Sequence, residues 1–267
     1  MSMPRPILLP TLAVVTLAVG CGLSEAPAGT GQQAPQLKAH VVQELPHDPS
    51  AFTQGLELAG GRLYEGTGLV GQSELRVTDP VSGAVSHRVP LPGSMFGEGI
   101  TVAGTKIWQL TWKDGVAFQR DLATGAEIGK ATYEGEGWGL CYDEARERLV
   151  MSDGSDRLTF RDPDTFESTG ELTVTSDGRG VTELNELECV EDDTVFANVW
   201  KTNTIVRIDL ASGKVTGVVD LAGLLDPEVH PGANVLNGIA AIPGTDEFLV
   251  TGKLWPKMFR VRFVEPT

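Results

Sequence analysis

Residues 207–216 read RIDLASGKVT, an aspartate followed by a short turn, a serine and a glycine. The pattern also occurs at three earlier places, RVTDPVSGAV (76–85), QRDLATGAEI (119–128) and FRDPDTFEST (160–169), the last with phenylalanine instead of glycine. The four aspartates, Asp79, Asp121, Asp162 and Asp209, lie 42, 41 and 47 residues apart. Aspartate closes such turns by accepting backbone N–H groups, and glycine supplies the positive φ. We therefore expect four β-hairpins at a regular spacing.

A second repeated element lies upstream of these hairpins. It reads TQGLEL (53–58), GEGITV (97–102), GWGLCY (137–142), LNELEC (184–189) and LNGIAA (236–241). Further strand-like runs separate the two sets, and no run of ten or more residues has a convincing helical period. Units of four strands repeating every ~40–50 residues are typical of a β-propeller. The sequence therefore predicts an all-β, five-bladed β-propeller domain over residues 37–267.

The last of the five units lacks one strand, because the chain ends after MFRVRFV (258–264). The segment QLKAHVVQEL (36–45) is strand-like and belongs to no unit. Pairing of the two segments would close the ring and protect the open edge of the last blade. We therefore expect the N-terminal strand to complete the fifth blade.

The N-terminus resembles a bacterial lipoprotein signal. The apolar run ILLPTLAVVTLAVG (7–20) follows Arg5 and ends directly before Cys21, and it is too short for a stable membrane span. We expect residues 1–21 to be a lipoprotein-type signal peptide with a lipid on Cys21, an ordinary signal peptide being the alternative. Residues 22–36 read as a flexible tether. The protein is then exported to the cell envelope, in the periplasm or at the outer membrane, and the lipid is its one link to the membrane.

Charge and composition limit the classes of molecule that we expect as binding partners. A net charge of −15 repels nucleic acid and anionic lipid head groups, so we expect neither as a partner. With 267 residues, 41% of them hydrophobic, the chain is long enough for one large core, and we expect a monomer. Cys141 and Cys189 both follow apolar runs, which favours free buried thiols, although export would permit a disulfide.

The first strand of each propeller blade lines the central channel, so the residue before each Gly-Leu or Gly-Ile step points toward the axis. The five axial residues are Gln54, Glu98, Trp138, Asn185 and Asn237. The second strands add Trp112, Trp200 and Lys253 near the same mouth. An aromatic wall with a few polar groups is the usual composition of a small-molecule site. A wet, polar channel without a chemical role is the alternative.

The same stretches resemble a known family. HDPSAFTQGL (47–56), FGEGIT (96–101), LNELE (184–188) and TGKLWPK (251–257), in this order, closely resemble the plant-type glutaminyl-peptide cyclotransferases. The similarity runs from about His47 to Val261. It implies a five-bladed propeller that converts an N-terminal glutamine of peptides or proteins to pyroglutamate and releases ammonia.

The resemblance also implies roles for individual residues. Glu98 is the implied catalytic acid and base, and Asn185 and Lys253 contact the reacting side chain. The implied substrate-binding residues are Phe52, Gln54, Phe96, Trp112, Trp138 and Trp200. The scheme requires no metal and no cofactor. Burial should raise the pKa of Glu98 and the charge of Lys253 should lower it, and the sequence leaves the balance open.

Two other functions remain open from the sequence. A metal-dependent sugar-lactone hydrolase on a propeller would need several axial carboxylates around a cation, and Glu98 is the one acid among the five axial residues. A non-catalytic binding propeller at the cell surface is the second alternative.

Overall fold

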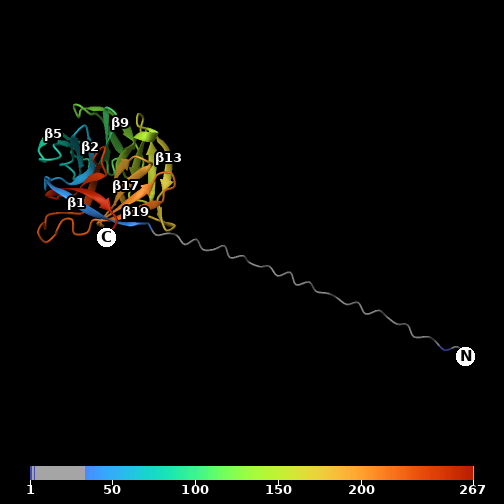
Figure 1. Cartoon of the computed structure of the whole chain (residues 1–267). Helices are drawn as coiled ribbons and strands as arrows, with labels where there is room; N and C mark the ends of the chain where they lie inside the picture. The colour runs from blue at the N-terminus through green and yellow to red at the C-terminus, as the bar shows by residue number, and fades with distance from the viewer. Residues whose placement is uncertain (2, 4–33, 267) are drawn as a thin grey trace. The chain divides into compact units, whose positions relative to one another are not determined.

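The computed structural model describes Met1, Met3 and residues 34–266 (Figure 1). Within this part the chain is all-β, as the sequence predicts, and its helical content is one short 3-10 turn, η1 (Glu144–Arg146). Apart from Met1 and Met3, the predicted signal peptide lies outside the described residues, as do Cys21 and all but the end of the predicted tether. No helix of the described part is long and apolar enough to cross a membrane.

Three sheets each contain four antiparallel strands in sequence order. The first is β2 (Thr53–Ala59), β3 (Arg62–Thr67), β4 (Glu74–Thr78) and β5 (Val85–Pro90). The second is β6 (Gly97–Ala103), β7 (Lys106–Thr111), β8 (Val116–Asp121) and β9 (Glu127–Thr132). The third is β10 (Leu140–Asp143), β11 (Arg148–Ser152), β12 (Arg157–Arg161) and β13 (Ser168–Thr173), and a two-stranded ribbon of β14 (Thr175–Ser176) and β15 (Arg179–Gly180) follows.

The remaining eight strands form one sheet with two halves. One half is β16 (Leu184–Val190), β17 (Thr194–Val199), β18 (Thr204–Asp209) and β19 (Val215–Asp220). The other is β1 (Gln36–Pro46), β22 (Lys257–Val264), β21 (Glu247–Gly252) and β20 (Leu236–Ala241). Strand β1 pairs antiparallel with β22, as the sequence predicts, and also parallel with β19. The N-terminal strand therefore covers the edge of the last unit and joins it to the fourth.

The repeated turns have the predicted geometry. Asp79 Oδ1 accepts the N–H of Ser82 at 2.7 Å, and the other three aspartates make equivalent bonds. Gly83 has a φ of 69°, and the glycines of the second and fourth turns match it. Phe166 stands at the glycine position of the third turn with a φ of 65°, which is costly for a residue with a Cβ. Its ring packs 4.8 Å from that of Trp108, and we infer that this buried contact offsets the backbone cost.

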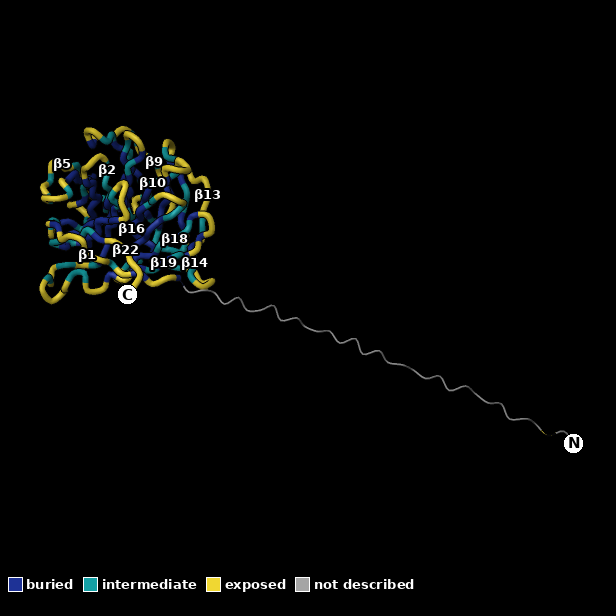
Figure 2. The backbone as a smooth tube through the Cα atoms, in the orientation of Figure 1, coloured by how far each residue is buried: buried dark blue, intermediate teal, exposed yellow. Residues whose placement is uncertain are grey.

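One strand of each unit lies at the centre, and we call β2, β6, β10, β16 and β20 the hub strands. Each packs beside the next, and β20 packs beside β2, so they form a closed cycle. Their backbones approach closely, since a Cβ on Gly99 would lie 2.7 Å from the backbone nitrogen of Leu140. The glycine after Glu98 therefore serves contact between neighbouring units. Figure 2 shows buried residues in the interior and exposed residues on the loops.

Apolar side chains fill the space between neighbouring sheets. Leu110 of the second sheet and Leu149 of the third belong to one buried cluster, which also contains Trp108. Burying one such side chain contributes about 1.5–3 kcal/mol. This packing holds the hub strands in place, and with them the side chains at their ends.

Cys141 of β10 and Cys189 of β16 form a disulfide, with Cα atoms 5.4 Å apart. The expectation of free thiols is therefore wrong. The reason is positional, because β10 and β16 are neighbouring hub strands and the two cysteines face each other between them. Each cysteine's own apolar surroundings do not reveal a partner that lies in another unit.

We expect loss of this disulfide to lower the free energy of unfolding by about 4 kcal/mol. Chain-entropy theory gives this value for a cross-link between residues separated by 48 positions. Urea denaturation of the wild type and of the double variant Cys141→Ala/Cys189→Ala would measure it. Equal free energies of unfolding for the two proteins would contradict the prediction.

Candidate active site

A pocket of about 340 Å³ lies where the hub strands begin. Gln54, Glu98 and Asn185 are the second residues of β2, β6 and β16. The pocket is lined by all nine residues that the sequence singles out as catalytic or substrate-binding: Phe52, Gln54, Phe96, Glu98, Trp112, Trp138, Asn185, Trp200 and Lys253. Lys201, Asn234 and Val235 line it as well. Residues from all five units thus meet at one place.

Asn237, the fifth axial residue, is fully buried but does not line this pocket. Its Nδ2 donates to the backbone oxygen of Thr53 at 3.1 Å and lies 3.4 Å from Gln54 Oε1. It therefore supports the start of β2.

The aromatic side chains of the pocket pack edge to face. The ring centroids of Phe52 and Phe96 are 6.1 Å apart, and those of Phe96 and Trp112 are 5.6 Å apart. Trp138 and Trp200 make a second pair at 5.3 Å. Edge-to-face packing fixes the ring orientations and gives the pocket a rigid, apolar wall.

Glu98 is 5% exposed, and its Oε1 accepts the amide N–H of Gln54 at 3.0 Å. Burial raises the pKa of Glu98 well above its usual value. The nearby charge of Lys253 opposes this rise and that of Glu136 adds to it. The balance that the sequence left open thus falls on the side of burial, which favours the neutral form of the carboxyl.

Lys253 is also buried, and its Nζ lies 5.1 Å from the ring centroid of Phe52. Burial lowers its pKa to about 8, although the charge of Glu98 acts in the other direction. Its backbone is fixed on both sides, because its N–H donates to Val235 at 2.9 Å and its carbonyl accepts from Asn234 at 2.8 Å. The site therefore holds a cationic donor that loses its proton just above neutral pH.

Two buried oxygens of the pocket residues have no hydrogen-bond partner within residues 34–266, Glu98 Oε2 and Asn185 Oδ1. Most buried polar atoms are paired in folded proteins. These two atoms are therefore available to a bound molecule that carries polar hydrogens. The backbone of Asn185 is held in place, since its carbonyl oxygen accepts the hydroxyl of Ser152 at 2.6 Å.

Glu136 is a site residue that the sequence analysis missed. Its Oε2 accepts the indole N–H of Trp112 at 2.7 Å and that of Trp138 at 3.0 Å, while Lys113 lies 3.3 Å from its Oε1. Burial alone would raise the pKa of Glu136, but these three donors lower it and keep the carboxylate charged. The one sequence signal was an acid two residues before Trp138, in a glycine-rich loop.

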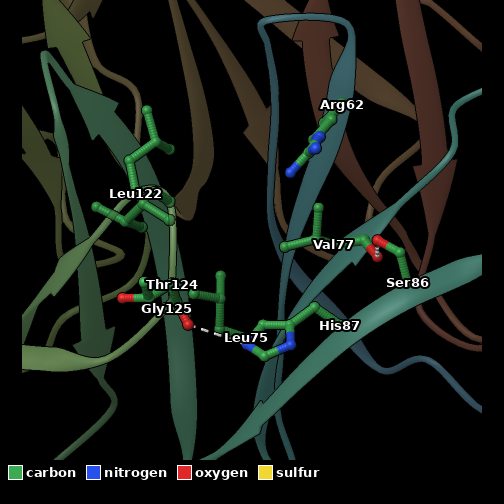
Figure 3. Close-up of a pocket in the computed structure, with 10 residues that line it drawn as sticks. Arg62, Leu75, Val77, Ser86, His87, Leu122, Thr124 and Gly125 are labelled. Atoms are coloured by element: carbon green, nitrogen blue, oxygen red, sulfur yellow. Dashed lines mark hydrogen bonds between the residues drawn. The ribbon is translucent and has the colours of Figure 1, made fainter.

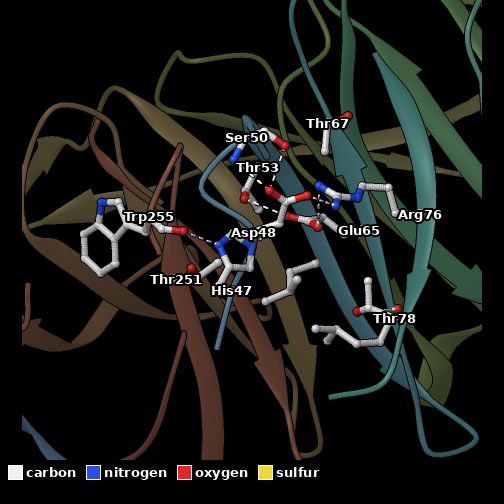
Figure 4. A network of polar contacts seen from close by, with 12 residues as sticks. His47, Asp48, Ser50, Thr53, Glu65, Thr67, Arg76, Thr78, Thr251 and Trp255 are labelled. Atoms are coloured by element: carbon white, nitrogen blue, oxygen red, sulfur yellow. Dashed lines mark hydrogen bonds and ion pairs between the residues drawn. The ribbon is translucent and has the colours of Figure 1, made fainter. Parts of the chain in front are cut away.

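A buried polar network anchors one side of the pocket (Figure 4). His47 bonds through Nδ1 to the carbonyl of Trp255 at 2.6 Å and through Nε2 to Glu65 at 3.0 Å. Both partners are acceptors, so both ring nitrogens carry a proton and the imidazole is charged. Thr53, between Phe52 and Gln54 in the sequence, donates to the same oxygen of Glu65 at 2.7 Å. The network therefore ties the start of β2 to the segment after Lys253.

The charges of the network support one another. Burial alone would lower the pKa of His47, but the Glu65 carboxylate raises it above its usual value. Burial would raise the pKa of Glu65, but His47 and Arg76 lower it. Arg76 also pairs with Asp48, next to His47. Both members of the His47–Glu65 pair are thus held in their charged forms.

We expect His47→Ala to lower the free energy of unfolding by about 3 kcal/mol at pH 5.5, because it leaves a buried charge without its partner. The raised pKa of His47 means that its stabilisation is complete below its unfolded pKa of ~6.5 and is lost as pH rises through the folded value. The pKa of Glu65 is lowered, so its contribution to the free energy of unfolding is complete above its unfolded pKa, at pH ~4.3. Urea denaturation between pH 5 and 9 should show the variant approaching the wild type at high pH.

The matched control is His40→Ala, since His40 is exposed on β1. We expect that variant to follow the wild type at every pH. A constant difference between His47→Ala and the wild type across this pH range would count against a charged imidazole.

A smaller hollow of about 110 Å³ lies between outer strands of the first and second sheets (Figure 3). His87 Nε2 lies 3.1 Å from the carbonyl of Thr124 there, and none of the predicted site residues lines it. Among residues 34–266, no group of three or more His, Cys, Asp or Glu side chains is arranged to hold a metal ion. Acid and base groups, an aromatic wall and unpaired polar atoms occur together in the pocket where the hub strands begin.

Comparisons with known proteins agree with the motif resemblance. Residues 13–263 match the model of a family described as glutamine cyclotransferase. The chain is 39% identical over 227 residues to the glutaminyl-peptide cyclotransferase of Arabidopsis thaliana, covering 83% of this chain and 70% of that protein. The structure matches the crystal structure of Myxococcus xanthus glutaminyl cyclase with a TM-score of 0.80 and 38% identity, covering 88% of this chain and 100% of the other.

Proposed function

The chain belongs to the glutamine cyclotransferase family, and we infer that it is a glutaminyl-peptide cyclotransferase. It acts on peptides or proteins with an N-terminal glutamine, which it converts to pyroglutamate with release of ammonia. We propose further that Glu98 moves the proton that this reaction requires. The observation that carries this proposal is a buried carboxyl inside an aromatic pocket, with a raised pKa and one oxygen that has no hydrogen-bond partner among residues 34–266.

The reaction begins when the free α-amine attacks the γ-carboxamide carbon of the same residue. The neutral amine is the nucleophile, and with an ordinary pKa of ~7.7–8.0 roughly a tenth of it is neutral at pH 7. The first step therefore needs no strong base. The aromatic wall favours it by folding the glutamine side chain toward its own amine and by excluding water, which would otherwise hydrolyse the amide.

Attack leaves a positive charge on the attacking nitrogen and a negative charge on the former carbonyl oxygen. The departing NH₂ group needs one proton to leave as ammonia, and the new ring nitrogen has one proton to lose. Glu98 starts protonated, gives its proton to the departing nitrogen and takes one from the ring nitrogen. The carboxyl ends in the state in which it began.

Lys253 and Asn185 act on the γ-carboxamide from the same pocket. The ammonium of Lys253 donates to the carbonyl oxygen and stabilises its developing negative charge. Asn185 Oδ1, which lacks a partner, accepts an N–H of the carboxamide and orients the leaving group. Lys253 and Asn185 thus contact different polar atoms of the substrate.

Glu136 positions the aromatic wall, because one of its oxygens holds two indoles from different parts of the second and third units. We expect Glu136→Ala to raise KM about 5- to 10-fold, because the two indoles lose their shared charged acceptor; this is a fraction of the ~1.5–3 kcal/mol that one hydrogen bond to a charged group can contribute. Tryptophan fluorescence should change at the same time. Removing the charge also lowers the pKa of Glu98, so the acid form should be lost at lower pH.

The conservative control is Glu136→Gln, which keeps an acceptor oxygen but not the charge. It should recover the KM and retain the altered pH profile. If alanine and glutamine gave identical KM values, Glu136 would not position the indoles.

An ammonia-release assay on a glutamine-initiated peptide tests the activity itself. We expect turnover that survives a metal chelator. Chelator-sensitive cleavage of a sugar lactone would favour the metal-dependent hydrolase, which needs several carboxylates where this pocket lining has one, Glu98. Binding of the peptide without turnover would favour the non-catalytic alternative.

We propose that the sheets form a five-bladed propeller. The closed cycle of five hub strands supports this, as does the division of the eight-stranded sheet into two antiparallel halves joined by the parallel pairing of β1 with β19. We also propose that the protein is a monomer, and the meeting of all nine predicted site residues of this chain in one pocket supports a site that one chain completes. A crystal structure with an open hub, or activity that requires a dimer, would overturn these proposals.

We propose that the protein is exported to the cell envelope and held there by a lipid on Cys21. The sequence before Cys21 supports this, and so does the disulfide, since such bonds persist in oxidising compartments. Metabolic labelling with a fatty acid should mark the wild type and not Cys21→Ser. Labelling of both proteins, or of neither, would refute the anchor.

A further inference from the structure

A second cavity, of about 480 Å³, adjoins the active-site pocket, and we call it the side groove. Lys201, Asn234 and Val235 line both cavities, so the two share an edge. The remaining lining comes from the turn after β17, the loop between β19 and β20, Leu236 at the start of β20, and Trp255. That loop spans residues 221–235.

The shared edge is the non-aromatic side of the active-site pocket. The five aromatic rings of the pocket come from the first four units, and each is partly buried. Lys201 and Asn234, on the edge between the fourth and fifth units, are exposed. A substrate whose amine and side chain are held in the pocket continues into solvent through its α-carbonyl. This open edge gives the rest of the peptide a way out that passes directly over the side groove.

We propose that the side groove binds the residues that follow the N-terminal glutamine and selects an apolar side chain at the second or third position. The inference rests on the proposed cyclotransferase function. Leu221, Leu225 and Val235 give the groove apolar contact surface, while Lys201 and Asp226 place one charge of each sign on its rim. An extended peptide with alternate apolar and polar side chains matches that arrangement.

The groove wall and Lys253 are parts of one hydrogen-bonded piece of backbone. Asn234 donates to the carbonyl of Lys253 at 2.8 Å, and the indole of Trp255 donates to the carbonyl of Asn234 at 2.7 Å. Peptide residues bound against this wall are therefore held in register with the group that contacts the γ-carboxamide. Binding at a distance from the reacting atoms then helps to align them.

The test compares three substrates, glutamine amide, Gln-Gly-Gly-amide and Gln-Leu-Phe-amide. Glutamine amide fills the pocket alone, so we expect Gln-Leu-Phe-amide to have a kcat/KM about 10-fold above both other substrates, since a few buried methylenes at ~0.8 kcal/mol each give such a factor. Leu225→Ala should remove most of this advantage through KM and leave glutamine amide unchanged. Val229→Ala is the matched control, because Val229 is an exposed apolar residue of the same loop that does not line the groove.

Asp226→Asn provides a second variant should Leu225→Ala fold poorly. It keeps an oxygen for the bond that Asp226 Oδ1 accepts from the backbone of Glu228 and removes the charge. We expect it to lower kcat/KM for Gln-Leu-Lys-amide about 3-fold and to leave Gln-Leu-Phe-amide unchanged, as for an exposed charge pair.

The outcomes distinguish failure of the side-groove proposal from failure of the proposed cyclotransferase function. Equal kcat/KM for the three substrates in the wild type would overturn the groove while the cyclotransferase function stands. A parallel loss on glutamine amide in Leu225→Ala would show a structural effect, and Asp226→Asn would then decide: an unchanged kcat/KM for Gln-Leu-Lys-amide in that variant would overturn the groove. No turnover of glutamine amide or of either peptide by the wild type would overturn the function, and the groove with it.

Discussion

Glu98→Gln should lower kcat at least about 10³-fold, because a glutamine side chain has no proton to exchange and general acid–base catalysis contributes about 10²–10⁴. The substitution is nearly isosteric, and its Oε1 still accepts the amide N–H of Gln54. Substrate binding should therefore survive, and KM should change little. Steady-state ammonia release and a separate binding measurement with the same peptide would establish this division.

Although Glu98→Gln should lower kcat, it should raise the free energy of unfolding at neutral pH. The folded-state pKa of Glu98 is raised well above the usual value, so between the unfolded and folded pKa values the unfolded state carries fewer protons and stability falls as pH rises. A neutral glutamine has no such cost. Glu98→Gln should consequently be more stable than the wild type at pH 7 and similar to it at pH 4, as urea denaturation would show. A less stable variant at pH 7, or one that keeps most of its kcat, would rule out a neutral catalytic carboxyl.

The location of the site was predictable because repetition reveals it. The spacing of Asp79, Asp121, Asp162 and Asp209 defines equivalent positions in successive units. Equivalent positions on hub strands must converge in a closed ring, whatever residues occupy them. The structure accordingly brings seven of the eight residues that the spacing singled out to one pocket, all but Asn237; Phe52 and Phe96, which the family resemblance alone indicated, line it as well. Their individual chemical roles came from the family resemblance and not from the spacing.

Contacts between units were not predictable in the same way. Glu136 binds Trp112 of another unit, and Cys141 bonds to Cys189 across neighbouring hub strands. A repeat states which positions are equivalent but not which side chains of different units touch. The balance between burial and charge at Glu98 likewise depends on distances in three dimensions. The loop that lines the side groove belongs to none of the repeated elements, so the sequence pattern did not predict the groove.

The dependence of the reaction rate on pH should identify Lys253 as the donor to the carbonyl oxygen of the substrate. The substrate amine must be neutral, so activity rises toward pH 8, whereas Lys253 must be protonated and its pKa is lowered to about 8. The two requirements give a bell-shaped profile with a narrow maximum slightly below or near pH 8. Lys253→Met removes one donor to the developing oxyanion, and such a loss costs about 10²–10³ in kcat. It also removes the charge that holds down the pKa of Glu98, so the acid form of Glu98 should persist to higher pH.

Lys253→Arg separates charge from geometry. Arginine stays protonated at every pH of such a profile, so the alkaline fall that belongs to Lys253 should disappear while the rise from the substrate amine remains. The planar fork fits the buried position above Phe52 less well than an ammonium, so the maximal rate should still be about 10-fold below wild type, a cost of ~1.4 kcal/mol in the barrier. Rate profiles from pH 6 to 10 for wild type, Lys253→Met and Lys253→Arg would settle the assignment. An alkaline fall near pH 8 that persists in Lys253→Arg would mean that another group donates to the carbonyl oxygen.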